Sequence, residues 1–366
     1  MKIVYVNDVV YKYAIGDPSA NGGAERYGWY LMRALAQAGW SVTVGVRFAL
    51  QAKEVKVIDG VRFLGLAHRQ HFLLDWYSLL KGEQPEWCFW QCADHLWGPA
   101  AEIARYLGVR TAFSTMHDLD VQVRKAQIGR KSLWLLYLWG LERSDLIFIQ
   151  HYGQRGYLPL HLQQRTYLLP GIVPLPERVI PHRERNRTVV WAAVIRPPKR
   201  PDLLIEIARR LPTVPFIVCG APRQSHWEPQ KIDQIMKDLR SLPNVDYRGH
   251  VAPEQTVQAI GSAGVLLSTS DGEGFPSVFL EAWAAGTPVV SMQIDPDHKV
   301  RDHELGKVAD TIEGAVEAVR VLMASTERCQ EMGMRSRLHV EEIHCPASAV
   351  QAFETAVARI TAVAKT

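Results

Sequence analysis

Short apolar runs alternate with segments of helical periodicity along this chain of 366 residues. Runs such as Lys2–Val6 and Phe216–Cys219 have the length of buried strands. The segments between such runs repeat their apolar residues every three or four positions. This alternation is typical of parallel sheets with helices on both faces. The pattern therefore predicts an α/β fold built from doubly wound sheets.

The length predicts two domains, each large enough to bury its own core. A stretch with several prolines and a run of charge, residues 172–187, is the expected linker. We expect the first domain to span 1–171 and the second to span 188–346. Strands are predicted in the first domain at 2–6, 41–46, 61–64, 86–90, 111–115 and 145–150, and in the second at 188–194, 216–219, 244–248, 263–267 and 288–292.

The composition of the chain bears on whether it binds nucleic acid, spans a membrane or holds a metal. The net charge is +4, with 22% charged and 47% hydrophobic residues, so whole-chain electrostatics do not favour nucleic acid. No run reaches the ~20 apolar residues of a bilayer span. Five cysteines form no metal-like cluster, and the chain starts with a strand rather than a secretory leader. We expect a cytoplasmic protein with no metal.

Two glutamates, Glu273 and Glu281, stand seven residues apart after the strand 263–267. Glu273 lies in a Gly/Pro loop, and Glu281 lies inside the next helix, where its carboxylate could accept two hydrogen bonds from a ribose diol. Gly274, Phe275 and Pro276 precede that helix, and Pro276 suits its first turn. Free N–H groups at the helix start would bind a phosphate. The alternatives are a loop acid and a surface or capping glutamate.

A basic loop follows the strand 188–194 and contains Arg196, Lys199 and Arg200. Such cations suit an anionic diphosphate, although a solvated basic loop is the alternative. Lys199 and Arg200 are adjacent, and the sequence leaves open which of them faces the phosphates.

Four further residues are candidates for the site. Gly22 and Gly23 lie in a loop expected between the first strand and the first helix; the run lacks the G-x-G-x-x-G fingerprint and could be a plain turn. His117 follows the strand 111–115, where a structural histidine is the alternative. Val251 follows the strand 244–248.

The run from Ser268 to Glu281, continuing through Ala282–Ser291, resembles the E-x7-E signature of retaining nucleotide-sugar glycosyltransferases of the GT-B fold, family 4. The resemblance implies two Rossmann-like domains facing across a cleft. It also implies a last helix, about 347–366, that crosses back to the first domain. In such enzymes the basic loop binds the diphosphate without a metal, and the second glutamate binds the ribose.

Carried onto this chain, the resemblance implies reacting-centre roles for Glu273, His117, Arg196 and Lys199. It implies donor binding by Gly22, Gly23, Arg196, Lys199, Arg200, Val251, Gly274, Phe275, Pro276 and Glu281. The chain departs from the common pattern after Met292, where Gln293–His298 replaces a Gly-Gly-x-Pro-Glu turn. The donor, a UDP- or GDP-sugar, is therefore left open.

These features predict a retaining, metal-independent transferase that moves a hexosyl unit to a glycan or lipid-linked acceptor, in cell-envelope polysaccharide or glycolipid synthesis. The alternatives are a UDP-sugar epimerase of the related fold and a non-catalytic partner of another transferase. Basic residues precede an aromatic helix within Val123–Trp139, a pattern that could dock on an anionic membrane face together with His71–Tyr77. The alternative there is a buried helix.

Overall fold

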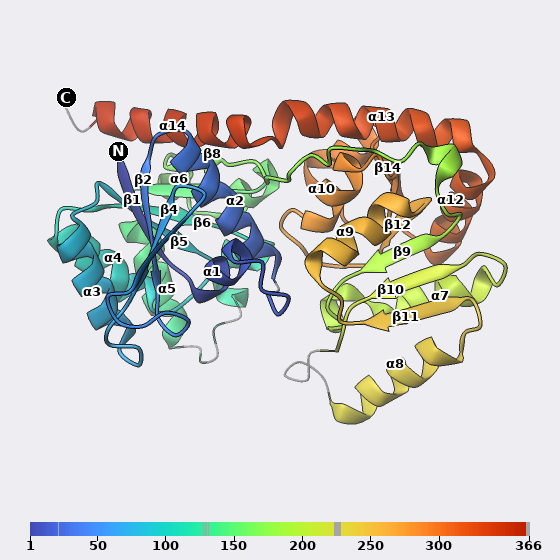
Figure 1. Ribbon diagram of the computed structural model, residues 1–366, viewed down its shortest axis with the longest axis horizontal. Coiled ribbons are helices and arrows are strands. Elements are labelled where there is room, and N and C mark those ends of the chain that lie inside the picture. The colour runs from blue at the N-terminus through green and yellow to red at the C-terminus, as the bar shows by residue number, and fades with distance from the viewer. Residues whose placement is uncertain (21, 127, 129, 131, 223–227, 364–366) are drawn as a thin grey trace. The chain divides into compact units, whose positions relative to one another are not determined.

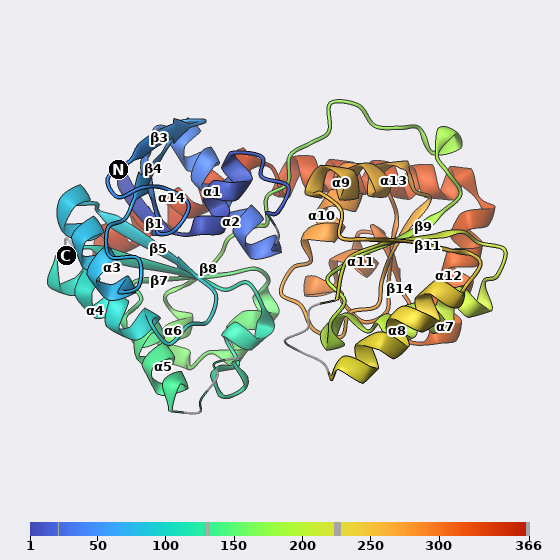
Figure 2. The ribbon, with the colours of Figure 1, turned by 60° about the horizontal axis from the view of Figure 1, so that its bottom comes forward.

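The computed structural model of the protein describes residues 1–20, 22–126, 128, 130, 132–222 and 228–363 (Figure 1). The chain divides into two compact units. The first contains residues 1–172 and 346–366, and the second contains residues 173–345. Each unit is a sheet with helices packed on it, as the alternation of strands and helices predicted (Figures 1 and 2). Among the described helices, none combines the length and the apolar character that a bilayer span requires.

The first unit has an eight-stranded sheet of order β3-β4-β2-β1-β5-β6-β7-β8. Its described strand pairs are parallel except for the edge pair β3–β4, which is antiparallel. The strand order changes direction between β1 and β5. The strands are β1 (Lys2–Val6), β2 (Ser41–Val46), β3 (Val55–Ile58), β4 (Val61–Gly65), β5 (Trp87–Gln91), β6 (Arg110–Ser114), β7 (Leu146–Ile149) and β8 (Thr166–Leu168).

The helices of the first unit include elements that the sequence pattern did not predict. They are α1 (Asp8–Ala14), α2 (Gly23–Gln37), α3 (Phe72–Glu83), α4 (Trp97–Tyr106), α5 (Leu133–Arg143), α6 (Leu160–Gln163) and α14 (Pro346–Val363). Helix α1 was missed because its sequence is rich in β-branched and aromatic residues, which are poor helix formers. Asn7 caps it, accepting from the N–H groups of Val9 and Val10.

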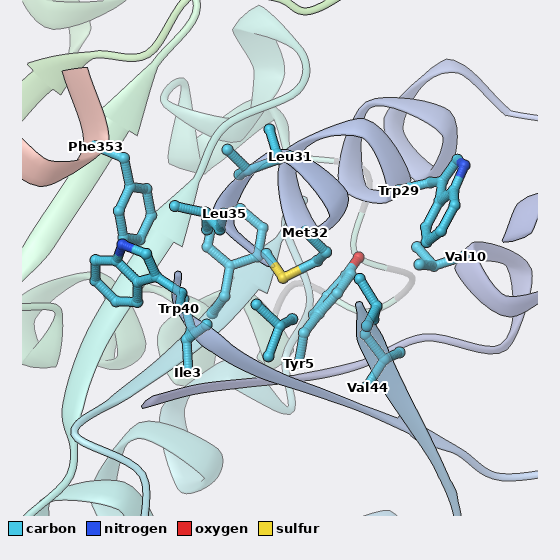
Figure 3. Close-up of a cluster of buried hydrophobic side chains, with 14 of the residues drawn as sticks. Ile3, Tyr5, Val10, Trp29, Leu31, Met32, Leu35, Trp40, Val44 and Phe353 are labelled. Atoms are coloured by element: carbon cyan, nitrogen blue, oxygen red, sulfur yellow. The ribbon is translucent and has the colours of Figure 1, made fainter. Parts of the chain in front are cut away.

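Helix α14 belongs to the first unit, as predicted for the last helix. Its Phe353 is fully buried and stacks on Phe148 with ring centroids 5.0 Å apart. The same ring meets the edge of Trp40 at 5.4 Å, and Figure 3 shows the two side chains next to each other. The indole N–H of Trp40 donates to Glu354 over 2.9 Å. The C-terminal segment is therefore part of the core of the first unit.

The second unit has a six-stranded, all-parallel sheet of order β11-β10-β9-β12-β13-β14. Its strands are β9 (Val189–Ala192), β10 (Phe216–Cys219), β11 (Val245–Gly249), β12 (Val265–Ser268), β13 (Val289–Ser291) and β14 (Gly306–Val308). Its helices are α7 (Pro201–Arg210), α8 (Pro229–Ser241), α9 (Pro253–Ser262), α10 (Ser277–Ala284), α11 (Lys299–Asp302), α12 (Ile312–Ala324) and α13 (Thr326–Ile343).

The strand order of the second unit reverses between β9 and β12. The chain adds β10 and β11 on one side of β9, then returns to add β12, β13 and β14 on the other. In open α/β sheets this switch point is where the loops after two neighbouring strands diverge and ligands bind. The basic loop follows β9, and the Glu273–Glu281 run follows β12.

Truncation of Phe353 tests the role of α14 in the first unit. We expect Phe353→Ala to lower the free energy of unfolding by about 3–5 kcal/mol, because it removes a buried aromatic ring and leaves a cavity. Urea unfolding followed by tryptophan fluorescence measures the change. Gln351→Ala, on the exposed face of the same helix, is the control and should stay within about 0.5 kcal/mol of the parent. Equal effects of the two variants would contradict the packing role.

Candidate functional site

The loops after β9 and β12 are bound to each other. The N–H of Asp271 donates to the carbonyl of Pro198 over 3.0 Å. The hydroxyl of Thr269 donates to the carbonyl of Lys199 over 2.7 Å and accepts from the indole N–H of Trp191 at 2.9 Å. These bonds place the basic loop beside the glutamate run at the switch point of the sheet.

The ammonium group of Lys199 and the carboxylate of Glu273 form an ion pair. Only 16% of the Lys199 side chain and 11% of the Glu273 side chain are exposed. Their attraction is therefore less screened by water than that of a surface pair. Lys199 and Glu273 are 74 positions apart in the sequence. Each was predicted separately as a site residue, and the structure brings the two side chains into direct contact.

Arg200 points to a different partner. Its backbone is in the left-handed region, with φ of 47°, and its guanidinium donates to Asp202, with a shortest distance of 2.6 Å. That hydrogen bond raises the pKa of Arg200. Of the two adjacent cations, Lys199 contacts the glutamate run and Arg200 binds the first turn of α7. Arg196 is half-buried and has no ion-paired partner within the described residues.

Glu281 lies in the middle of α10 and is 5% exposed. Pro276 occupies the N-cap position with extended backbone, so the helix starts at Ser277 and the expected place of Pro276 in the first turn was wrong by one residue. No side chain in the described chain caps this N-terminus. Its N–H groups and the positive end of the helix dipole are suited to an anion.

Aromatic packing holds the loop before α10. The ring of Phe275 meets Trp283 with centroids 6.0 Å apart and His344 with centroids 5.0 Å apart. Trp283 is fully buried and donates its indole N–H to the carbonyl of Leu305 over 3.0 Å. The ring of Phe275 thus anchors the Gly274–Phe275 segment to the core of the second unit. The sequence analysis had considered only the backbone N–H of Phe275.

A buried arginine binds the opposite end of α10. Arg185 donates to the carbonyl of Ala285 over 2.5 Å, to the hydroxyl of Thr287 over 2.6 Å and to the carbonyl of Ile180 over 2.8 Å. Burial lowers its pKa to about 10, so it stays charged at neutral pH. A cation at a helix C-terminus is favourable. Sequence reasoning assigned this residue to the linker, and no local signal distinguishes it from Arg183.

Val251 lies half-buried between β11 and α9. It packs on the core cluster that contains Phe279 and Trp283. Strand β10 separates β11 from β9. Val251 is therefore on the flank of the switch point, and the loop contacts described above do not include it.

Gly22 and Gly23 belong to the first unit. Gly22 lies between α1 and α2 and Gly23 is the first residue of α2, so the two glycines do not lie in a loop directly after the first strand as expected. Gly22 is the N-cap of α2 with φ of 107°, a conformation suited to glycine. The amide of Gln91, at the end of β5, donates to the carbonyl of Ala24 over 3.2 Å and accepts from the hydroxyl of Tyr5 at 2.6 Å. This turn is thus held at the β1–β5 switch point of the first unit.

His117 follows β6, the neighbour of β5. Its Nδ1 accepts from the N–H of Leu119 at 3.0 Å, so the neutral ring carries its proton on Nε2. Buried Asp120 accepts from the N–H groups of Met116 at 2.7 Å and His117 at 3.0 Å. Burial raises the pKa of Asp120, and those hydrogen bonds partly offset the rise. Asp118 accepts from Gln154 and is hydrogen-bonded to His151.

The sequence of the second unit is similar to that of known glycosyltransferases. Residues 177–339, which lie within the second unit and stop inside α13, match the family model described as "Glycosyl transferases group 1". The chain is 33% identical over 113 residues to the D-inositol 3-phosphate glycosyltransferase of Mycobacteroides abscessus, covering 31% of this chain and 26% of that protein. It is 29% identical over 138 residues to the enzyme of that name from Mycolicibacterium smegmatis, covering 35% and 32%.

The chain thus spans about a quarter to a third of the length of these two relatives. Among solved structures, a sucrose-phosphate synthase from Thermosynechococcus elongatus aligns with a TM-score of 0.79 at 16% identity, covering 99% of this chain and 100% of that one. Anabaena HepE in complex with UDP and glucose aligns with a TM-score of 0.73 at 13% identity, covering 98% and 100%. The predicted fold of two Rossmann-like domains is confirmed, and the family match supports a glycosyltransferase.

Replacement of Arg185 tests its role at the end of α10. We expect Arg185→Gln to destabilise the second unit by about 1–3 kcal/mol for each buried acceptor left without its donor. Arg183→Gln is the matched control, because the Arg183 side chain is 77% exposed, and it should change stability by less than about 0.5 kcal/mol. Thermal unfolding measures both. Equal losses, or none in either variant, would contradict an anchoring role.

Proposed function

We propose that the protein is a retaining glycosyltransferase of family 4 that moves a hexosyl unit from a nucleoside diphosphate sugar to a hydroxyl of a glycan or lipid-linked acceptor. The observation that carries this proposal is the contact between Lys199 and Glu273 at the β9–β12 switch point, with Glu281 on the helix that follows. The cations come from the loop after β9, whereas the carboxylates and the helix N-terminus come from the loop after β12 and from α10, so two segments far apart in the sequence supply the site.

Each group has a role that its chemistry suits. Arg196 and Lys199 neutralise the diphosphate, and the N–H groups at the start of α10 bind a phosphate oxygen. The buried Glu281 carboxylate accepts from the two ribose hydroxyls. Glu273, oriented by Lys199, accepts from a hexose hydroxyl. The donor contacts expected from the sequence for His117, Gly22 and Gly23, which belong to the first unit, stay predictions.

In the proposed reaction the bond from the anomeric carbon to the diphosphate oxygen breaks, and a bond to the acceptor oxygen forms on the same face of the sugar. The acceptor proton passes to the departing phosphate. Negative charge develops on the diphosphate as it leaves, and preorganised cations stabilise that charge most in the transition state. Because Arg196 and Lys199 supply the positive charge that compensates the leaving diphosphate, the proposal includes no metal.

The comparisons indicate which donors and acceptors to test first. HepE, which shares the fold, was solved with UDP and glucose, so UDP-sugars are the first donors to test. The matched relatives are named for D-inositol 3-phosphate, which makes that compound one acceptor to include. A role in envelope polysaccharide or glycolipid synthesis and a cytoplasmic location complete the proposal; the five free cysteines suit a reducing compartment.

Ligand-induced stabilisation tests the donor site. Thermal unfolding is measured with UDP, GDP, ADP and their common sugars in EDTA. A nucleotide at 100 times its dissociation constant should add about 2.7 kcal/mol to the folded state, which raises the melting temperature by several degrees. Glu281→Gln should strongly reduce the shift, because the amide loses the negative charge and replaces one of the two acceptor oxygens with an NH2 group that cannot accept from a ribose hydroxyl. Glu254→Gln, on the exposed face of α9, is the control and should retain it.

The same samples distinguish the alternatives. Transfer to an acceptor with the anomeric configuration of the donor retained, read by proton NMR, supports the proposal. Isomerised sugar nucleotide without an acceptor would instead show an epimerase. Absence of a shift with every nucleotide would favour a non-catalytic partner. A shift that appears only when a divalent metal replaces EDTA would overturn the metal-independent arrangement.

A further inference from the structure

Positive charge is concentrated in one segment of the first unit. Residues 121–165 contain seven Lys/Arg and two Asp/Glu, a net charge of +5, whereas the whole chain has a net charge of +4. The rest of the chain is therefore close to neutral. Lys125, Arg130 and Arg155 are exposed within this segment. The two acids have partners in the fold: Glu142 is hydrogen-bonded to His161, and Asp145 accepts from Thr111.

Helix α5, inside this segment, exposes apolar side chains. Its inner face contains Tyr137, Gly140 and Leu141, all buried. Its outer face carries Leu135, which is 55% exposed, and Trp139, which is 37% exposed. A surface helix of a globular domain normally places polar residues on its outer face. In α5 the exposed face is apolar, and the function proposed above does not use it.

Helix α6 extends this apolar surface. His161 on α6 is hydrogen-bonded to Glu142 on α5 at 2.9 Å, and Arg165 donates to the carbonyl of Glu142 over 3.2 Å. The two helices therefore lie next to each other (Figure 2). Leu160, at the start of α6, is 79% exposed. We call Leu135, Trp139 and Leu160 the α5–α6 face.

The stretch His71–Tyr77, which the sequence analysis grouped with this segment, does not belong to the α5–α6 face. It forms the start of α3, where Trp76 is fully buried and donates to the carbonyl of Ala100 on α4. Helix α4 packs against both α3 and α5. Gln127, Gly129 and Lys131 of the basic run lie outside the described residues.

We propose that the α5–α6 face docks on an anionic lipid surface. The apolar side chains would enter the boundary between headgroups and acyl chains, where tryptophan is favoured. Lys125, Arg130 and Arg155 would lie next to anionic headgroups. The combination of an exposed apolar face with most of the chain's excess positive charge favours such a surface over a second copy of this basic unit, whose charge would repel. This inference goes beyond the proposed transfer reaction and does not depend on it.

Co-sedimentation with lipid vesicles tests the proposal. The full chain should bind vesicles of phosphatidylcholine and phosphatidylglycerol at low salt, and should bind pure phosphatidylcholine much more weakly. Each basic residue near an anionic surface is worth about fivefold in the partition coefficient. The Lys125→Gln/Arg130→Gln variant should therefore bind about 25-fold more weakly. Leu135→Ser/Leu160→Ser should also weaken binding, with an effect that persists at high salt.

The matched control is Arg178→Gln/Lys237→Gln, which removes two exposed cations from the second unit and should leave binding unchanged. Circular dichroism shows that each variant is folded. The proposal is overturned if the full chain fails to bind anionic vesicles. It is also overturned if the control variant loses as much binding as Lys125→Gln/Arg130→Gln. Dimerisation in sedimentation equilibrium that Leu135→Ser/Leu160→Ser abolishes, without vesicle binding, would instead assign the face to a second copy.

Discussion

The parallel pairing of β9 with β12 is the constraint on which the candidate site depends. Val189 pairs with Val265 and Val190 with Leu266, so two strands that are far apart in the sequence end at the same edge of one sheet. The loops that follow the two strands therefore lie side by side, and the hydroxyl of Thr269 donates to the carbonyl of Lys199. Without that register, the cation and the carboxylate of the Lys199–Glu273 pair would lie on separate parts of the surface.

Helix α10 connects this edge to the core of the second unit. Its first residues follow a loop held by Phe275, and its last carbonyl accepts from the buried guanidinium of Arg185. A charge is costly to bury unless its hydrogen bonds are satisfied, and Arg185 has three acceptors. The helix that carries Glu281 is thus fixed at both ends, which limits the motion of a group proposed to bind ribose.

The first unit shows how tertiary context overrides local pattern. Helix α1 forms from a sequence of low helix propensity because Asn7 caps it and Val10 and Tyr11 are buried. Edge strand β3 was missed because its residues are mostly exposed and lack a buried run. Conversely, α5 was predicted from its apolar residues, but only the structure shows that Leu135 and Trp139 face outward while Tyr137 faces the core.

The sequence by itself determined the alternation of strands and helices, because the apolar period is a local property of the chain. It also determined which loops hold the cations, glycines and glutamates. The tertiary structure decided which of these groups meet: Lys199 rather than Arg200 contacts Glu273, and Arg185 rather than Arg183 binds α10. The physical reason is that neighbouring residues of the same type have the same local signal, and only strand order and burial distinguish their surroundings.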